Sequence, residues 1–577
     1  MTIVCVNEIT IFRVLVGSLL GRPCRVLAVE PFMPQSEFML ERVVKRLVAQ
    51  GGASMLIDED SELAPVRAYP VSVNGYDLFA RTEAWQRDYF RFPLIESRLP
   101  EYVMAVKAAA CNLVADRLVA ALVQSRRIER GDGEAVIGIS DLLDGLAKAS
   151  AEREAPGLSP RLLRRMVNMA LAAVCAIAAA VWAFTRFRPG QKAPQDVFFA
   201  ADFYKDTRDV RLYDAVQKAG PQLMVVRSRK VVSDRDMDVV GNRPSCARVD
   251  GIFGSLRAAT ASAWLAVRDV VRIYAVLADM PIPFFYRAVT LPWKRITYRA
   301  LFNRYRPRFF WGRDPYNPDH VIRRQELNRV GGESFGLLHG FGALTALYPM
   351  FRYISYDRIF LFGGFISDLY RDTWDPTMKP VVSGTFSATS EVYTRLHGRK
   401  GGDDIVVMTS FTALENNEMV CASVRALAAA FPERKILLQV KPPFPTWAGA
   451  PDFIRRCCEN VPNVISTEKG YLDLLETALC VFTDPSSVFL ETLQFRVPAF
   501  VFDLGSQRLR TMVYRDRPIV CVSTPAAAVE RVRSLETGSP PYPWAALADL
   551  TDFSGREFSQ IVAAEMGVVH EAAARAS

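Results

Sequence analysis

The sequence is poor in the side chains that bind metals and in paired cysteines. It has only four histidines in 577 residues, and none of its ten cysteines belongs to a CxxC pair. Structural zinc sites need several closely spaced cysteines and histidines, so this composition argues against one. Most of the cysteines stand in apolar runs, which is typical of reduced, buried thiols in a cytosolic protein. We therefore expect no metal site.

The sequence also lacks the features of a signal peptide and of a P-loop nucleotide-binding motif. The N-terminus, MTIVCVNEITIF, has no basic region before its apolar residues and no small-residue cleavage site, which predicts no signal peptide. No G-x-x-x-x-G-K-[ST] motif is present, which excludes a P-loop ATPase.

Acidic side chains are absent between Asp279 and Asp314, where basic and aromatic residues alternate. This segment belongs to a chain with a net charge of +9 and a pI near 9.0, which favours an anionic partner. Arginines interleaved with rings are typical of single-stranded nucleic-acid binding, of a lipid headgroup layer, or simply of a basic helix over a core. An apolar segment upstream favours the membrane, so we expect an anionic membrane surface and no nucleic acid as partner.

That upstream segment, Met166 to Phe184, holds 19 residues of which only Asn168 is clearly polar. As a helix it would be about 28 Å long, close to the thickness of a bilayer core. Arginines precede and follow it, so the positive-inside rule assigns no orientation. A spanning helix and a buried or interfacial helix fit the pattern equally well.

Hydrophobic periodicity predicts an α/β protein whose last region forms a doubly wound parallel sheet. Residues 1–150 alternate strand-like and helix-like patterns, and 151–192 form a linker and the apolar helix. Residues 193–378 begin with a βαβ pattern and include the basic aromatic segment, at about 258–313. Residues 379–577 alternate short apolar strands and helices regularly, which indicates a parallel sheet with its site at the carboxyl ends of the strands.

The strongest local signal is LCVFTDPSSVFLETLQFRVPAFVF, in which a strand ends at Asp484 and a helix follows. Ser486 and Ser487 stand at the predicted start of this helix, where free N–H groups can hold a phosphate. Glu491 lies one turn on and is placed to accept a ribose hydroxyl. An ordinary capped helix with a solvated Glu491 fits the spacing as well.

The segment TDPSSVFLETLQFRVPAFVF resembles the donor-site segment of GT-B-fold glycosyltransferases. The resemblance implies that Ser486 and Ser487 contact the donor phosphates and that Glu491 contacts the ribose. VVSGTFSATSEVY resembles the entry to the second domain of these enzymes, with Thr385-Phe386 in place of their small–proline step. The resemblance also implies two Rossmann-like domains with doubly wound parallel sheets, an acceptor domain at 193–378 and a donor domain at 379–577. It further implies no metal or other cofactor.

His339 lies in SFGLLHG, which together with YDRIFLFGGFISDLY resembles surface-carbohydrate, capsule and glycerophosphate transferases. In that group the histidine is a base or a phosphate ligand, and the role falls here on His339. An imidazole titrating near neutrality suits the removal of a proton from an attacking hydroxyl. A lone histidine at the end of an apolar strand is otherwise an ordinary core residue.

Two further donor contacts are expected at strand ends. Lys441, in Lys441-Pro442-Pro443, can pair with a phosphate, although relatives have a histidine in this step that is absent here. Ser410 ends the first strand of the last domain and is a weaker phosphate candidate. The resemblance covers about Arg313 to Leu504, a third of the chain.

These observations predict a membrane-associated, metal-independent glycosyltransferase at the cytoplasmic face of the inner membrane. It would move a sugar from a nucleotide-sugar, a substrate rather than a cofactor, to a surface polysaccharide or lipid-linked acceptor. A glycerophosphotransferase, a nucleotide-sugar epimerase and a non-catalytic membrane scaffold remain as alternatives on the same fold.

Overall fold

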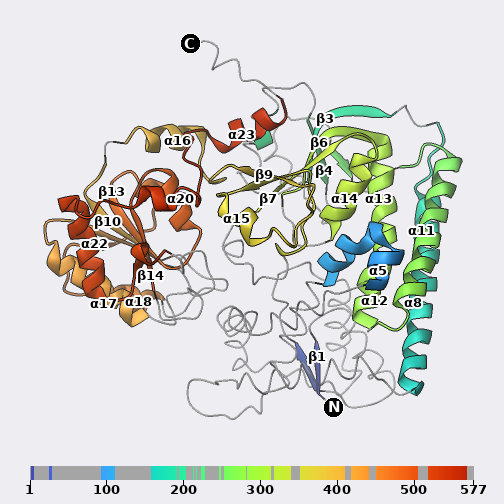
Figure 1. Ribbon diagram of the computed structural model, residues 1–577, viewed down its shortest axis with the longest axis horizontal. Coiled ribbons are helices and arrows are strands. Elements are labelled where there is room, and N and C mark those ends of the chain that lie inside the picture. Colours follow the sequence, from blue (N-terminus) through green and yellow to red (C-terminus); the bar gives the residue numbers. More distant parts are fainter. Residues whose placement is uncertain are drawn as a thin grey trace. The chain divides into compact units, whose positions relative to one another are not determined.

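The structure is a computed structural model of the full chain, shown in Figure 1. It describes residues 93–110, 158–190, 194–202, 212–213, 216, 223–227, 246–248, 252–280, 282–313, 318–338, 351–399, 401–409, 417–440, 450–503 and 517–567, together with two strands near the start. These strands, β1 (Thr2–Cys5) and β2 (Arg25–Ala28), pair in parallel. They match the two strands that the sequence predicts there.

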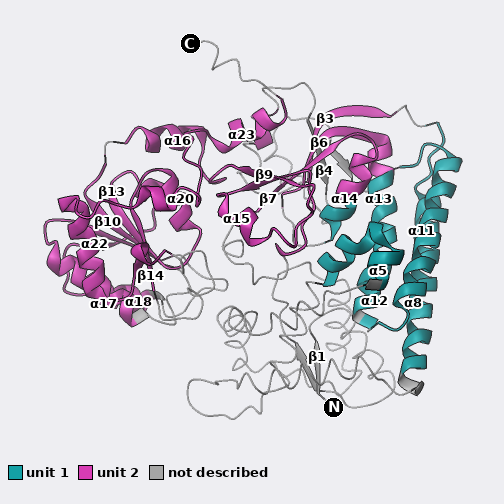
Figure 2. Ribbon diagram, in the orientation of Figure 1, with its two compact units in different colours: residues 1–192, 252–299, 317–322 teal, residues 193–251, 300–316, 323–577 magenta. Residues whose placement is uncertain are grey.

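The chain divides into two compact units, which Figure 2 shows in teal and magenta. Unit 1 contains residues 1–192, 252–299 and 317–322, and unit 2 contains the rest. The sequence predicted that 252–299 belongs to the domain that starts at residue 193. The structure differs, because this stretch leaves the sheet of unit 2 and packs on the apolar helix of unit 1.

An antiparallel pair of long helices forms one side of unit 1, α8 (Leu158–Thr185) and α11 (Leu256–Leu277). The predicted apolar segment lies wholly within α8. Ser255 caps α11 by accepting a hydrogen bond from the N–H of Ala258 at 3.2 Å. The helices α5 (Pro93–Arg98) and α12 (Ile282–Val289) pack against this pair, with the 3-10 helix η2 (Pro100–Tyr102) after α5.

A seven-stranded parallel sheet forms the first half of unit 2, with strand order β5-β4-β3-β6-β7-β8-β9. Its strands are β3 (Gln195–Asp202), β4 (Leu223–Arg227), β5 (Cys246–Arg248), β6 (Tyr305–Trp311), β7 (Glu333–Leu337), β8 (Arg358–Leu361) and β9 (Lys379–Val382). β4 and β5 lie on one side of β3, and β6 to β9 lie on its opposite side. This is the doubly wound order of a Rossmann-like domain.

A six-stranded parallel sheet forms the second half, with order β12-β11-β10-β13-β14-β15. Its strands are β10 (Asp404–Thr409), β11 (Ile436–Val440), β12 (Val464–Ser466), β13 (Ala478–Thr483), β14 (Ala499–Phe502) and β15 (Cys521–Val522). Numbered along the chain, this order is 3-2-1-4-5-6, again the Rossmann order. The predicted fold class, with two doubly wound parallel sheets, is confirmed.

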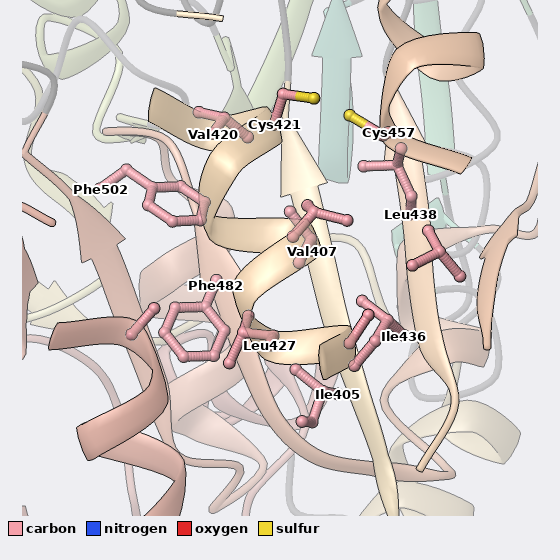
Figure 3. Close-up of a cluster of buried hydrophobic side chains, with 14 of the residues drawn as sticks. Ile405, Val407, Val420, Cys421, Leu427, Ile436, Leu438, Cys457, Phe482 and Phe502 are labelled. Atoms are coloured by element: carbon pink, nitrogen blue, oxygen red, sulfur yellow. The ribbon is translucent and has the colours of Figure 1, made fainter. Parts of the chain in front are cut away.

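Apolar strands and amphipathic helices build the core of this second sheet. Side chains of β10, β11 and β13, such as Val407, Leu438 and Phe482, meet Val420 and Leu427 of α17 (Asn417–Ala430), as Figure 3 shows. The helices α18 (Ala450–Cys458) and α22 (Pro525–Thr537) also contribute to this cluster. The near-continuous apolar strands are those of a sheet that is buried on both faces.

The last described helix, α23 (Phe558–Glu565), packs on the first sheet although it follows the second in the chain. Its residues Phe558, Ile561 and Val562 are buried against side chains of β3, β6, β7 and β8. The ring of Phe558 lies 6.0 Å from that of Trp311. The chain therefore returns to the seven-stranded sheet after completing the six-stranded one.

Most rings of the basic aromatic segment are buried. Phe284 and Phe285 on α12 are 3% and 0% exposed, and Phe309, Phe310 and Trp311 on β6 are at most 3% exposed. The sequence predicted that this segment, about 258–313, faces a membrane. These rings instead fill protein cores, because the segment ends in a central strand of the seven-stranded sheet.

Candidate functional site

The carboxyl edge of the six-stranded sheet is where a ligand is expected from its topology. The chain runs from β10 outward through β11 and β12, then returns to the other side of β10 as β13. Ligands of such sheets bind at this switch point, in the crevice outside the carboxyl ends of the two strands. Met408 of β10 pairs with Thr483 of β13, so the segments that follow these residues start side by side.

The turn after β13 is rich in hydroxyl groups. Thr483 Oγ1 lies 3.2 Å from Ser486 Oγ and donates a hydrogen bond to the carbonyl oxygen of Asp484 at 2.9 Å. Asp484 is 2% exposed, and its N–H lies 3.4 Å from the carbonyl oxygen of Met408. The turn is thereby attached to the end of β10.

The helix that follows the turn is α20 (Val488–Gln494), shorter than the sequence predicted. Ser487 stands at its N-cap in a helical backbone conformation, and its side chain makes no capping hydrogen bond. Ser486 Oγ instead accepts a hydrogen bond from the N–H of Val488 at 3.3 Å. Both predicted serines thus lie in the turn at the sheet edge, and Ser486 takes the capping role expected of either.

Thr409, the last residue of β10, carries a buried hydroxyl group. Its side chain is 3% exposed, and Oγ1 has no partner among the residues that the structure describes. A buried hydroxyl without a partner is costly, and such groups in native structures call for an explanation such as an absent ligand. Thr409 lies beside the turn at 483–487, at the switch point itself.

Glu491 is buried on α20 and is held by two hydroxyl groups. It is 6% exposed, and its Oε2 accepts hydrogen bonds from Thr385 Oγ1, at 2.8 Å, and from the hydroxyl of Tyr471. Oε1 accepts none from the described residues. Burial and the adjacent carboxylate raise the pKa of Tyr471 well above its usual value, so this phenol stays protonated and donates. Glu491 is therefore not the solvated side chain of the simpler interpretation.

The segment that connects the two sheets is fixed to the same helix. The N–H of Thr385 donates to Gln494 Oε1 at 2.6 Å. Gly384 has a φ of +63°, and a Cβ at this position would lie 2.3 Å from Gln494 Oε1. Only glycine fits this conformation and this close approach. The backbone conformation and the close contact with Gln494 thus explain why a glycine stands in VVSGTF.

At the carboxyl edge of the seven-stranded sheet, Asp202 ends β3 and forms an ion pair with Arg323. Arg323 also donates to the carbonyl oxygen of Gly312, just after β6, at 3.1 Å. β3 and β6 are the two strands at the switch point of this sheet. Asp202 is thus engaged in an ion pair within the fold.

Three predicted site residues, His339, Ser410 and Lys441, lie outside the described residues. The strands that precede them are described. β7 ends at Leu337, β10 at Thr409 and β11 at Val440. The predicted strand ends are therefore confirmed, and the roles of the three side chains stay predictions.

Sequence reasoning missed Thr409, Thr385 and Tyr471. Thr409 was read as part of a strand, and its unpaired hydroxyl has no signature in the residue pattern. Thr385 was noted only as a departure from a family motif, and Tyr471 only as the start of a helix, α19 (Tyr471–Leu474). Thr385 and Tyr471 contact Glu491 although they lie 106 and 20 positions from it in the chain.

No group of three or more His, Cys, Asp or Glu side chains in the described part of the chain is arranged to hold a metal ion. A hollow lined by Asp196, Arg306, Arg308 and Gly331 lies at the amino ends of β3 and β6. That edge is opposite to the one where parallel sheets bind ligands. We therefore place the candidate site at Thr409 and 483–487.

No protein-family model matches the chain, and no characterised protein matches it in sequence. Its fold is similar to that of the UDP-GlcNAc 2-epimerase from Methanocaldococcus jannaschii, with 10% identity and a TM-score of 0.39, covering 65% of this chain and 100% of that one. The same enzyme from Neisseria meningitidis, bound to UDP-GlcNAc, shows 10% identity and a TM-score of 0.39, covering 64% and 99%. The glycotransferase of kitacinnamycin shows 14% identity and a TM-score of 0.37, covering 66% and 100%. All three TM-scores are below 0.5.

Proposed function

We propose that the protein is a glycosyltransferase that takes a sugar from a nucleotide-sugar donor. The donor binds at the carboxyl edge of the six-stranded sheet, where β10 and β13 meet. One observation carries this proposal: the buried hydroxyl of Thr409, which has no partner among the described residues, stands at the switch point of a Rossmann-ordered sheet, beside a turn of hydroxyl side chains.

The chemistry of this turn suits the oxygens of a donor phosphate. Hydroxyl groups of Thr409, Ser486 and Ser487 can donate to phosphate oxygens, and Lys441 and Ser410 follow strands that end at the same edge. Oε1 of Glu491 can accept a ribose hydroxyl while Thr385 and Tyr471 hold Oε2. In this proposal the negative charge of the leaving nucleotide is stabilised by donors already in position.

His339 acts in this proposal as the base that removes the proton of the acceptor hydroxyl, or as a ligand of the donor phosphate. The support is its place after β7, two strands from β3 in the seven-stranded sheet, at the carboxyl edge. The acceptor is a surface polysaccharide or a lipid-linked glycan. We place the enzyme at the cytoplasmic face of the inner membrane, supported by the apolar helix α8 and by the net positive charge.

Calorimetric titration of the purified protein with nucleoside diphosphates tests the donor site. Thr409→Val is expected to weaken binding about tenfold, because one donor to the phosphate is lost. Thr551→Val is a matched control, since Thr551 is also buried with an unpaired Oγ1 but lies outside the turn. Equal affinity in wild type and Thr409→Val would remove Thr409 from the site, and no binding of any nucleotide by wild type would refute the proposal.

Product analysis with a panel of nucleotide-sugars separates the enzyme classes. Sugar transfer to a glycan or lipid-linked acceptor is expected, with loss of activity in His339→Ala. An epimerised nucleotide-sugar formed without acceptor, or transfer of glycerol phosphate, would contradict glycosyl transfer. Unchanged polysaccharide output in cells that carry His339→Ala and Glu491→Ala would indicate a non-catalytic scaffold.

A further inference from the structure

One side of α8 exposes large apolar side chains along its length. They recur with a helical period, so they lie on one face. The face is formed by Leu163, Met166, Val174, Ile177, Val181 and Phe184, which are between 47% and 64% exposed. We name these six side chains the α8 stripe. Soluble proteins rarely expose so much contiguous apolar surface, so the α8 stripe indicates a binding surface.

From about Asn168 onward, the side of α8 opposite the α8 stripe packs against α11 (Figure 1). Near the start of α8, Asn168 Nδ2 donates to the carbonyl oxygens of Ala278 and Met280, at 2.8 and 3.0 Å. Beyond its end, the N–H of Arg188 donates to the carbonyl oxygen of Phe253 at 3.0 Å. The two helices therefore run antiparallel between these two contacts.

This pairing argues against a transmembrane course for α8. By length and composition alone, Arg161–Thr185 is the one candidate membrane span among the described residues, with 28% of it buried in the protein. If it crossed a bilayer, α11 would cross beside it and carry Arg268 and Asp269 to the middle of the hydrocarbon. Asp269 is fully buried in an ion cluster with Arg295 and Tyr102, at 3.2 and 2.7 Å. Charged residues at that depth are costly.

The charges around α8 favour anionic lipid over a second copy of the chain. Between Glu154 and Asp196 there are five arginines and one lysine and no acidic residue. At one end, Asp279 binds both Arg161 and Arg165, so one carboxylate faces two guanidinium groups. Two copies that met through the α8 stripe would bring like charges together at both ends, whereas anionic headgroups would neutralise them.

We propose that the α8 stripe inserts into the surface of an anionic lipid bilayer, with the axis of α8 in the membrane plane. The apolar side chains enter the boundary between headgroups and acyl chains, and the flanking arginines contact the headgroups. This inference rests on the proposed membrane association and adds its partner and orientation. It does not depend on the donor site.

Flotation of the full-length protein with lipid vesicles tests the binding. Vesicles of phosphatidylcholine mixed with phosphatidylglycerol are expected to bind at least about tenfold more protein than phosphatidylcholine alone, with a decrease at high salt. Ile177→Glu is expected to reduce binding about tenfold. Ile519→Glu is the matched control, since Ile519 is 40% exposed in unit 2, and should leave binding unchanged. Equal binding by wild type and Ile177→Glu would overturn the proposal.

Alkaline carbonate extraction tests the orientation, because it releases proteins held at the membrane surface and retains those that span it. Release of the wild type is expected, and retention would overturn an in-plane helix.

Light scattering on the free protein tests for a second copy. A dimer that Ile177→Glu converts to a monomer while vesicle binding persists would also overturn the proposal. Nucleotide titration of Ile177→Glu should match wild type, so a failed donor site is distinguished from a failed membrane site.

Discussion

At the scale of single residues, the candidate site is defined by hydroxyl groups and one buried carboxylate. Thr409 Oγ1 is buried and has no partner in the described part of the chain, and Glu491 accepts two hydrogen bonds on one oxygen. An unpaired buried hydroxyl destabilises the fold, and a site retains it when a ligand supplies the partner. Thr409 and Glu491 thus differ: Thr409 Oγ1 has no partner among the described residues, whereas Glu491 Oε2 is held by Thr385 and Tyr471.

Thr409→Val is therefore expected to stabilise the protein while it weakens nucleotide binding. Removal of the unpaired hydroxyl should raise the free energy of unfolding by about 1 kcal/mol. Chemical denaturation without ligand measures this change. Thr551→Val should give a similar gain with normal nucleotide affinity, and destabilisation by Thr409→Val would show that its hydroxyl is satisfied within the fold.

Tyr471→Phe is expected to destabilise the protein by about 1–2 kcal/mol at neutral pH, because Glu491 loses one hydrogen-bond donor. The pKa of Tyr471 is raised in the folded state. Tyr471 therefore contributes fully to the free energy of unfolding below the ordinary tyrosine pKa of about 10. This contribution is lost as the pH rises toward the pKa of the folded state. The stability difference between wild type and Tyr471→Phe should shrink above about pH 10. Denaturation curves over this range measure it, and a difference that does not change with pH would contradict the account.

At the scale of elements, an arginine joins three parts of the seven-stranded domain. Arg324, on α14 (Asp319–Asn328), donates to Asp357 Oδ1 at 2.9 Å, just before β8. It also donates to Asp375 Oδ2 at 2.5 Å and to Thr377 Oγ1 at 2.8 Å, in the segment before β9. Although burial opposes its ionisation, hydrogen bonds from Thr377 and the charge of Arg324 lower the pKa of Asp375.

Arg324→Met is expected to destabilise the protein by about 3 kcal/mol, because two partly buried carboxylates lose their shared cation. Arg371→Met is the matched control, since the Arg371–Asp368 pair is exposed and should contribute less than about 1 kcal/mol. Because the pKa of Asp375 is lowered in the folded state, its contribution to the free energy of unfolding is present above about pH 4 and is lost as the pH falls further. Urea denaturation of both variants at neutral and acidic pH measures these effects, and equal stabilities would refute them.

At the scale of the whole molecule, contacts far apart in the chain hold unit 2 together. The ring of Phe558 on α23 packs on the first sheet, with its centroid 5.7 Å from that of Phe360 and 5.0 Å from that of Phe386. The six-stranded sheet lies between these residues in the chain. Helix α23 is therefore part of the core of the seven-stranded sheet, whose first strand begins at residue 195.

Phe558→Ala is expected to destabilise the protein by about 3–5 kcal/mol, the usual loss for a buried phenylalanine. Its thermal midpoint should fall below that of Leu369→Ala, a control whose side chain is 37% exposed. Differential scanning calorimetry compares the two. Equal midpoints would show that α23 does not contribute to the stability of the first sheet.

The regular alternation of apolar strands and amphipathic helices was determined by the sequence alone. The strands at 404–409, 436–440, 478–483 and 499–502 were predicted within one or two residues, because a buried strand is a short apolar run and its crossover helix has a 3.6-residue period. Ser486, Ser487 and Glu491 were likewise located at a strand end and its following helix. The positions of these strands and helices depend on residues that are close together in the sequence, so the sequence pattern predicts them.

Only the tertiary structure decided which side chains are paired, buried or exposed. The pattern did not show that Thr409 lacks a partner, that Thr385 and Tyr471 hold Glu491, or that Asp269 places charge in the middle of α11. The basic aromatic segment was read as a membrane surface, yet most of its rings fill cores, while α8 exposes the apolar face. A side chain's surroundings come from segments distant in the chain, which local periodicity does not encode.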